Sequence, residues 1–270
     1  MVASKTIGFI GGGNMGEALI KGLLKSGSFD ASHIRVSDIS QDRLHHLRDT
    51  YQVSIFADNG ELAGGSDVIV LAVKPQQVGD VLAETHASLE HLPLLISIAA
   101  GVPIASLEQG LAKPVPVVRV MPNTPALVLT GVSAIAGGTH TDSEHLAVAR
   151  ALFEAVGVVV EVDETHMDAV TGLSGSGPAY VYLFVEALID AGVLMGLSRP
   201  VARDLAVQTT LGAAKLLAES GEHPGALKDQ ITSPGGTTIH GLTILESGGT
   251  VSYTHLRAHE TNDLISYAVF

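Results

Sequence analysis

The feature that most constrains this chain is a glycine-rich turn near its N-terminus. Gly11, Gly13 and Gly16 have the spacing G-x-G-x-x-G, and they follow an apolar run over residues 6–10 that is typical of a short buried strand. Apolar residues at helical spacing come next, and Gly27 can end that helix. In this setting the first glycine allows a tight turn, the second lets backbone approach a pyrophosphate, and the third lets helix pack on strand. The turn therefore predicts dinucleotide binding at a helix N-terminus, although a tight turn without function would have the same spacing.

The composition excludes several classes of function. The chain has 270 residues, 46% of them hydrophobic, so one large domain or two modest ones can form. It has no cysteine, which excludes disulfides, thiolate catalysis and cysteine-ligated metals. A formal net charge of −13 argues against a nucleic-acid groove. No apolar run reaches the roughly 18 residues of a membrane span, and no signal peptide is evident. We therefore expect a cytoplasmic protein without nucleic-acid or membrane partners.

The first 163 residues alternate between apolar, strand-like runs and amphipathic helices, which predicts an open α/β sheet. After the first strand, further strands are expected at residues 33–37, 53–56, 67–73, 94–98, 115–120, 132–136 and 158–162. In the sequence between the strands at 132–136 and 158–162 we expect a helix capped by Asp142 or Thr141. Ligands of open α/β sheets bind beyond the carboxyl ends of the strands, so the turns that follow these strands should face the cofactor.

The turn after the second strand bears on the choice of cofactor. Asp38 lies about 20 residues after Gly16, where an acidic residue is expected to bind the adenosine ribose. A carboxylate there favours NAD, because it would repel the 2′-phosphate of NADP. Ser37, Ser40 and Arg43 could instead reorganise around that phosphate. Asp38 could also be an ordinary turn residue.

Three later turns supply further candidates. Lys74 follows the strand at 67–73 and is either a cofactor contact or a solvated loop lysine. Ala99 and Ala100 are small enough to let backbone lie close to a ligand. The turn at 121–125 contains two prolines and should be rigid.

From residue 164 the strand signals stop, and helices are expected at about 165–171, 179–195, 199–220, 224–231 and 237–245. The two longest are apolar around most of their surface, which indicates burial on several sides. Two such helices are hard to bury within one small helical domain, so the pattern suggests a core between subunits.

A second glycine-rich stretch precedes the last of these helices. Gly235 and Gly236 leave backbone N–H groups accessible, and Thr237 and Thr238 begin the helix. Backbone donors, hydroxyl groups and a helix N-terminus together can bind a small carboxylate. An ordinary helix cap after a turn is the alternative.

With both stretches in view, the chain resembles the Δ1-pyrroline-5-carboxylate reductases over residues 7–249. The motifs that carry the resemblance lie at residues 11–16, 72–76, 121–125, 173–180 and 229–246. The resemblance implies an N-terminal Rossmann-type parallel sheet, residues 1–163, and a C-terminal all-α dimerisation and substrate domain, residues 164–251. It implies a homodimer or a larger oligomer built from dimers. It also implies that NADPH or NADH reduces a small molecule, the cyclic imine L-1-pyrroline-5-carboxylate, to L-proline in the last step of proline biosynthesis.

The resemblance also implies the site residues. Thr238 is the expected catalytic residue, which would reach the ring nitrogen while the 233–238 loop binds the carboxylate. The protonated imine is already electrophilic, so the reaction needs positioning rather than a metal or a histidine base; we expect no metal site. The expected substrate-binding residues are Ser176, Ser233, Gly235, Gly236, Thr237 and Thr238. The expected cofactor-binding residues are Gly11, Gly12, Gly13, Asn14, Met15, Gly16, Ser37, Asp38, Asn59, Ala72, Val73, Lys74, Pro75, Ala99, Ala100 and Asn123.

Residues 252–270 depart from the family pattern, in which a final amphipathic helix lies on the dimer interface. We expect a non-native tail there, which would weaken the dimer. Two other functions stay open. A hydroxy-acid dehydrogenase of similar architecture would need a lysine or histidine base, for which Lys74 is poorly placed. A dinucleotide-binding regulator without turnover would not need the second anion site at 233–238.

Overall fold

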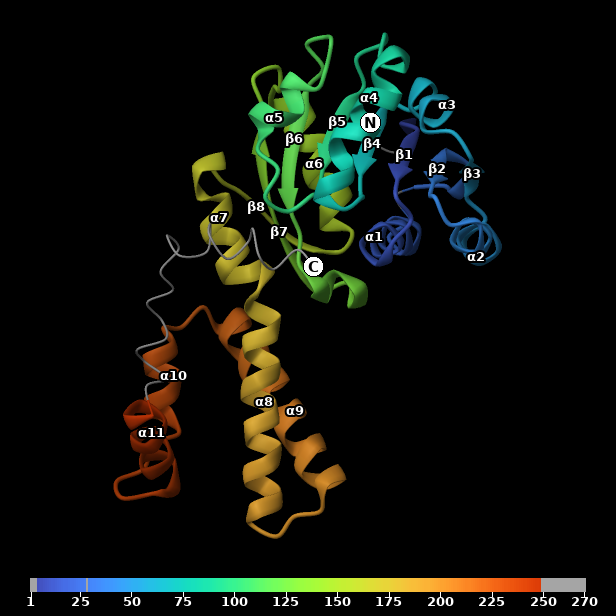
Figure 1. The fold of residues 1–270 in the computed structure, drawn as a ribbon. Helices are drawn as coiled ribbons and strands as arrows, with labels where there is room; N and C mark the ends of the chain where they lie inside the picture. Colours follow the sequence, from blue (N-terminus) through green and yellow to red (C-terminus); the bar gives the residue numbers. More distant parts are fainter. Residues whose placement is uncertain (1–3, 28, 249–270) are drawn as a thin grey trace. The chain divides into compact units, whose positions relative to one another are not determined.

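The computed structural model describes residues 4–27 and 29–248, and its first unit is built on one eight-stranded sheet (Figure 1). The strand order is β3-β2-β1-β4-β5-β6-β7-β8, and neighbouring strands run parallel except for β6 and β7. The strands are β1 (Ile7–Ile10), β2 (Ile34–Ser37), β3 (Ser54–Phe56), β4 (Val68–Leu71), β5 (Leu94–Ser97), β6 (Val117–Met121), β7 (Gly131–Gly137) and β8 (Gly157–Glu161). The predicted Rossmann-type sheet is confirmed.

Helices cover both faces of this sheet. Side chains alternate between the faces along β1, so that Ile7 and Phe9 join one hydrophobic core and Ile10 joins the other. The first core is covered by α1 (Asn14–Lys25), α2 (Gln41–Tyr51) and α6 (Ser143–Glu154). The second is covered by α3 (Asn59–Gly64), α4 (Val78–Thr85) and α5 (Ile104–Gln109). Short 3₁₀ turns connect them at η2 (Ala31–His33), η3 (Pro75–Gln77), η4 (His86–Ser88) and η5 (Thr124–Val128).

The order of the strands reverses between β1 and β4. From β1 the chain moves outward to β2 and β3, then crosses back to β4 on the other side of β1. Two backbone hydrogen bonds hold the carboxyl ends of these strands together: Gly11 N–H donates to Ser37 O at 2.8 Å, and Ala72 N–H donates to Ile10 O at 2.8 Å. This arrangement is the topological switch point at which open α/β sheets bind ligands.

The segment after β8 packs against the sheet. It comprises η6 (Glu164–His166), α7 (Met167–Val170) and a π turn, η7 (Thr171–Gly175). Met167 is fully buried, and the nearly buried Arg119 of β6 donates from Nη1 to Glu164 Oε1 at 3.0 Å. By contacts the described chain therefore divides between Pro178 and Ala179, whereas its composition changes at residue 164. The predicted boundary between 163 and 164 stays a prediction.

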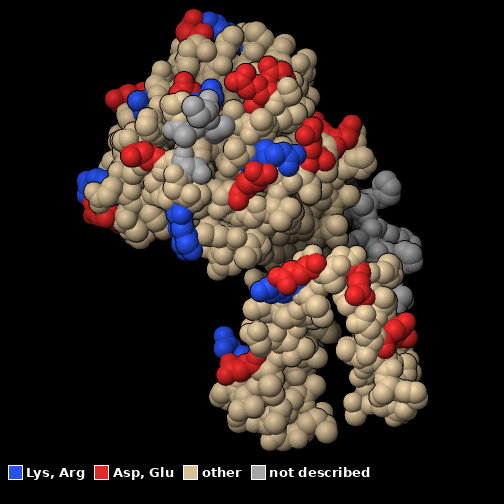
Figure 2. Space-filling view, turned by 180° about the vertical axis from the view of Figure 1, so that it is seen from behind, with Lys and Arg blue, Asp and Glu red and all other residues tan. Residues whose placement is uncertain are grey.

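The second unit is helical and differs in its burial. It contains α8 (Gly177–Leu194), α9 (Arg199–Ser220), α10 (Pro224–Gln230) and α11 (Thr237–Ser247). Within these four helices only Ala202 and Ala206 are buried. On the face that Figure 2 shows, uncharged residues dominate the surface of this unit and charged ones are sparse. Many of its large apolar side chains are therefore exposed in the described chain.

One helical stretch corrects an expectation from the sequence. Residues 164–194 form a helical run that is long and apolar enough to cross a membrane by length and composition alone, and its most apolar 18-residue window has a mean hydropathy of 1.4. None of that window is buried within the described part of the chain. The expectation about residues 252–270 lies outside the described residues.

Candidate functional site

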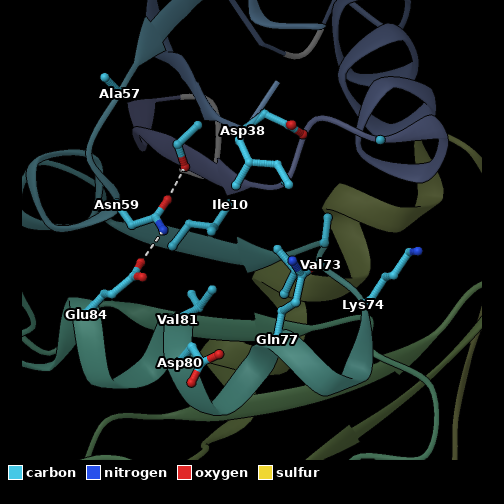
Figure 3. Close-up of a pocket in the computed structure, with 15 residues that line it drawn as sticks. Ile10, Asp38, Ala57, Asn59, Val73, Lys74, Gln77, Asp80, Val81 and Glu84 are labelled. Carbon is cyan, nitrogen blue, oxygen red and sulfur yellow. Dashed lines mark hydrogen bonds between the residues drawn. The ribbon is translucent and has the colours of Figure 1, made fainter. Parts of the chain in front are cut away.

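A cavity of about 390 Å³ lies at the carboxyl ends of β1, β2 and β4 (Figure 3). Eight residues expected from the sequence to bind the cofactor line it: Gly11, Gly13, Ser37, Asp38, Asn59, Ala72, Val73 and Lys74. Seven lining residues were not anticipated: Ile10, Ile39, Ala57, Gln77, Asp80, Val81 and Glu84. The cavity occupies the switch point of the sheet, where a dinucleotide would bind.

The glycine turn has the stereochemistry that a pyrophosphate site needs. Gly11 adopts φ +101°, and a Cβ there would lie 2.5 Å from the Ala72 carbonyl oxygen, so no other residue fits. A Cβ on Gly16 would lie 2.6 Å from the Gly11 carbonyl oxygen, which explains the close approach of helix to turn. Gly13 differs, because a Cβ there would meet no atom within 4 Å. Its missing side chain thus leaves room beside the cavity, and the turn fits a dinucleotide.

The helix that follows the turn begins beside the same cavity, because its N-cap residue lies in the lining. Gly13 is the N-cap of the 12-residue α1, and no side chain of the described residues caps it. The first-turn N–H groups and the positive end of the helix dipole therefore suit an anion. Asn14, Met15 and Gly16 belong to α1 and do not line the cavity.

Asp38 is tied to the glycine turn rather than free. Its Oδ2 accepts a hydrogen bond from Gly12 N–H at 2.7 Å, and its Oδ1 accepts one from Ser40 N–H at 2.9 Å. The carboxylate thus orders both the turn and the start of α2, while the side chain still lines the cavity. Gly12 itself is not in the lining. The ribose role predicted for Asp38 stays a prediction.

A chain of hydrogen bonds crosses the opposite wall of the cavity (Figure 3). Ser37 Oγ donates to Asn59 Oδ1 at 2.7 Å, and Asn59 Nδ2 donates to Glu84 Oε2 at 2.6 Å. Glu84 and Asp80 lie on α4, whose cavity face was not anticipated. The signal was present in the sequence, since residues 77, 80, 81 and 84 follow the i, i+3, i+4, i+7 spacing of one helix face.

A charged cluster lies behind the glycine turn. Arg43 of α2 donates from Nε to the Gly12 carbonyl oxygen and from Nη2 to the Glu17 carboxylate. Glu17 Oε1 also accepts a hydrogen bond from Tyr51 OH at 2.8 Å and lies 3.1 Å from His46 Nε2. Partial burial works to raise the pKa of Glu17, but hydrogen bonds from Tyr51, His46 and Arg43 outweigh it and hold that pKa below its usual value. Glu17 is therefore a carboxylate at neutral pH.

Other expected cofactor residues lie outside the cavity lining: Pro75, Ala99, Ala100 and Asn123. Asn123 connects three segments instead. Its Oδ1 accepts a hydrogen bond from Val132 N–H at 2.9 Å, and its Nδ2 donates to Ser174 O at 3.1 Å. Ser176, expected to bind substrate, donates its N–H to Thr171 O at 2.8 Å and so closes the π turn. Single π turns are frequent at functional sites.

The second glycine-rich stretch lies in the helical unit. Gly236 is the N-cap of α11, and its N–H donates to Ser233 O at 3.1 Å. Gly235 has φ +65°, and no side chain of the described residues caps the helix. Thr237 and Thr238 are its first two residues, and the Thr238 hydroxyl has no hydrogen bond to any described residue. The helix N-terminus and this hydroxyl are thus both available to a ligand.

No cluster of three or more His, Cys, Asp or Glu side chains that could hold a metal ion occurs within residues 4–27 and 29–248.

Comparisons with known proteins agree with this geometry. A family model described as pyrroline-5-carboxylate reductase dimerisation matches residues 164–261, and one described as NADP oxidoreductase, coenzyme F420-dependent, matches residues 6–101. The pyrroline-5-carboxylate reductase of Synechocystis sp. is 49% identical over 243 residues, 90% of each chain.

Two solved structures are similar over almost the whole chain. A pyrroline-5-carboxylate reductase from Coxiella burnetii has a TM-score of 0.91 at 36% identity and covers 98% of both chains. The Plasmodium falciparum pyrroline carboxylate reductase with NADP bound has a TM-score of 0.85 at 36% identity, covering 99% of this chain and 98% of that one. The resemblance seen in the sequence is confirmed, and the all-α dimerisation region explains the apolar helices of the second unit. The chain belongs to the pyrroline-5-carboxylate reductase family.

Proposed function

We propose that this protein reduces L-1-pyrroline-5-carboxylate to L-proline with NADPH or NADH, the last step of proline biosynthesis. The observation that carries the proposal is the cavity at the switch point of the sheet, with the open Gly13 position beside a helix N-terminus. Membership of the reductase family supports the choice of substrate.

The chain would hold the cofactor through the turns around this cavity. Residues 11–16 would bind the pyrophosphate, with Gly13 providing the space and α1 the N–H groups. Ser37, Asp38 and Asn59 would face the adenosine side, and residues 72–75 the other wall. Ala99, Ala100 and Asn123 would contact the cofactor beyond the described cavity. The nicotinamide ring supplies the hydride when it is bound.

The substrate would bind through residues 233–238 and Ser176. The carboxylate would bind to the segment that contains Ser233, Gly235 and Gly236 and to the backbone N–H of Thr237, because a helix N-terminus favours an anion. The Thr238 hydroxyl would hydrogen-bond the ring nitrogen and orient the imine carbon toward the cofactor. Orientation of this kind can contribute several kcal/mol to the rate. No metal enters this proposal.

We infer that the protein is a cytoplasmic homodimer or a larger oligomer built from dimers. The family match to a dimerisation region supports the homo-oligomer. The exposed side chains of α8 and α9, among them Leu183 at 68% and Leu211 at 59%, supply the apolar surface for it. The same surface accounts for the apolar run at 164–194 without a membrane.

Steady-state kinetics of the purified protein test the proposal. We expect oxidation of NADPH or NADH that depends on pyrroline-5-carboxylate, and no comparable turnover with small 2-hydroxy acids and the oxidised cofactors. Turnover only with a hydroxy acid would replace the proposal with a dehydrogenase. Nucleotide binding without any turnover would leave a dinucleotide-binding regulator.

A further inference from the structure

We propose that Glu17 is a positioning residue for cofactor selectivity: it holds Arg43 against the glycine turn, so that this arginine does not serve a 2′-phosphate and the site prefers NADH. The inference rests on the dinucleotide site of the proposed function and goes on to say which nucleotide that site takes.

The first step is the geometry of the Gly12 peptide. Asp38 accepts the hydrogen bond of its N–H at 2.7 Å, while Arg43 Nε donates to its carbonyl oxygen. One acidic and one basic side chain thus hold the same residue of the turn. Arg43 follows the second strand closely enough to serve a 2′-phosphate, yet two of its guanidinium nitrogens are engaged by Gly12 and Glu17. It does not line the cavity.

The cavity that the cofactor would enter carries more acidic than basic side chains. Asp38, Asp80 and Glu84 line the cavity with carboxylates, and Lys74 is the only basic residue in that lining. A phosphate monoester adds about 1.5 to 2 negative charges near pH 7, so NADPH needs cationic compensation that NADH does not. Arg43 could provide it, but the Glu17 carboxylate in contact with the guanidinium offsets its charge.

The third step is that Glu17 is itself held in place. Tyr51 OH donates to its Oε1, and His46 Nε2 lies 3.1 Å from the same oxygen. Its side chain is 23% exposed and that of Arg43 is 24% exposed, so the pair is partly shielded from water and salt. A carboxylate anchored from two other side chains is a fixed partner that competes with any phosphate for Arg43.

The experiment measures nucleotide affinity in the absence of imine. Dissociation constants for NADPH and NADH are determined by nucleotide fluorescence, and those for adenosine 2′,5′-bisphosphate and 5′-AMP by calorimetry. Glu17→Gln should lower the dissociation constant of NADPH by about five- to twentyfold, which corresponds to the gain of one charge-assisted hydrogen bond at a partly exposed site. The dissociation constant of NADH should change by less than about twofold. Glu17→Ala should have the same effect. The affinity for adenosine 2′,5′-bisphosphate should rise as that for NADPH does, because both carry the 2′-phosphate, whereas the affinity for 5′-AMP should stay as nearly constant as that for NADH.

Two comparisons separate positioning from net charge. In an Arg43→Ala background, Glu17→Gln should no longer tighten NADPH, because the effect acts through the guanidinium. Glu90→Gln removes the same charge from an exposed ion pair with Lys113 and should leave the affinities for NADPH and NADH unchanged. Melting temperatures of all variants show that each is folded.

Several outcomes would overturn the inference: wild-type protein that binds NADPH more tightly than NADH, a Glu17→Gln variant without tighter NADPH binding, or an equal gain in the Arg43→Ala background. Binding of neither nucleotide to the wild type would overturn the dinucleotide site as well. Binding that follows the expected pattern, but without reduction of pyrroline-5-carboxylate, would leave the inference standing and remove only the proposed activity.

Discussion

The two units of this chain use apolar residues in opposite ways. In the sheet unit every residue of β1, β4 and β5 is buried, and the helices on each face supply the partners. In the helical unit, α8 and α11 have no buried residue at all. The core of the sheet unit closes within one chain and carries the cavity at the switch point. The helical unit leaves apolar surface exposed, which suits it to a second chain.

Because of this difference, the two units should contribute separately to the proposed activity. The cofactor cavity is lined by residues of the sheet unit alone, so nucleotide affinity should be insensitive to assembly. The 233–238 loop belongs to helices whose apolar faces are exposed, so substrate binding should depend on the oligomer. The predictions below test that division.

The largest effect is expected for Leu183→Asp in α8. Leu183 is 68% exposed in the described chain. Burying a leucine contributes about 1.5–3 kcal/mol, and a symmetric dimer contains the residue twice. The association constant should therefore fall by at least about a hundredfold. Sedimentation velocity over a concentration series measures it, and nucleotide affinity should stay within about twofold.

Leu183→Met is the matched control, because it nearly conserves volume and apolarity. If Leu183→Asp still associated like the wild type, the exposed face of α8 would not be the interface. If nucleotide affinity fell with the dimer, the division between the units would be wrong.

The next effect is expected for Gly13→Val in the sheet unit. A Cβ at this position would meet no atom within 4 Å, so the melting temperature should stay within about two degrees. The added methyl groups would occupy the space proposed for the pyrophosphate, and nucleotide affinity should fall by about ten- to a hundredfold, as for overpacking of 1–3 kcal/mol. Calorimetric titration with NADH and a thermal melt of the same sample measure both.

Gly11→Val provides the contrast within the same turn. Its positive φ and the nearby Ala72 carbonyl should make this variant lose stability first. A folded Gly13→Val variant with unchanged nucleotide affinity would reduce the whole motif to a turn.

Thr238→Ala tests the helical unit. Losing a hydrogen bond to a charged group costs roughly 1.5–3 kcal/mol, so kcat/KM for pyrroline-5-carboxylate should fall by about ten- to a hundredfold. Cofactor KM and association should change little. The N-cap of α11 is Gly236, so stability should also change little. A lower melting temperature with unaltered kcat/KM would show that Thr238 is only a structural residue.

Much of the fold could be read from the sequence because the signals were local. Asp142 was expected to cap a helix, and its carboxylate accepts hydrogen bonds from the N–H groups of Glu144 and His145. The strand expected at 115–120 is β6, whose register with β5 begins at Val117 opposite Leu95, and the Leu95 N–H donates to the Pro116 carbonyl oxygen at 2.9 Å.

Features that depend on contacts between distant segments could not be read in the same way. The hydrogen-bond chain through Ser37, Asn59 and Glu84 joins three separate elements, so the pattern of any one segment does not predict which residues pair. The antiparallel pairing of β6 and β7 departs from the expected parallel sheet. Its cause is the short connection through η5, which cannot span a parallel crossover.

The smallest expected effect concerns Asp38→Asn and sharpens the comparison within the sheet unit. The amide keeps one acceptor oxygen, so it can hold either the Gly12 or the Ser40 N–H, but not both as Asp38 does. The turn should become less ordered, so that affinity for both nucleotides falls. Because this loss is common to NADPH and NADH, it cancels in the ratio of their kcat/KM values.

Removing the carboxylate should shift the ratio of kcat/KM for NADPH over NADH upward by about three- to fivefold. The size follows from one unit charge at a solvated distance, worth about 1 kcal/mol. The shift should stay this small because Glu17 still engages Arg43, so the variant removes a repulsion without supplying a cation. Combining Asp38→Asn with Glu17→Gln should therefore give about the product of the two single shifts. An unchanged ratio in Asp38→Asn would show that its carboxylate serves only the backbone of the turn, while a shift as large as in the double variant would show that Arg43 was never held back.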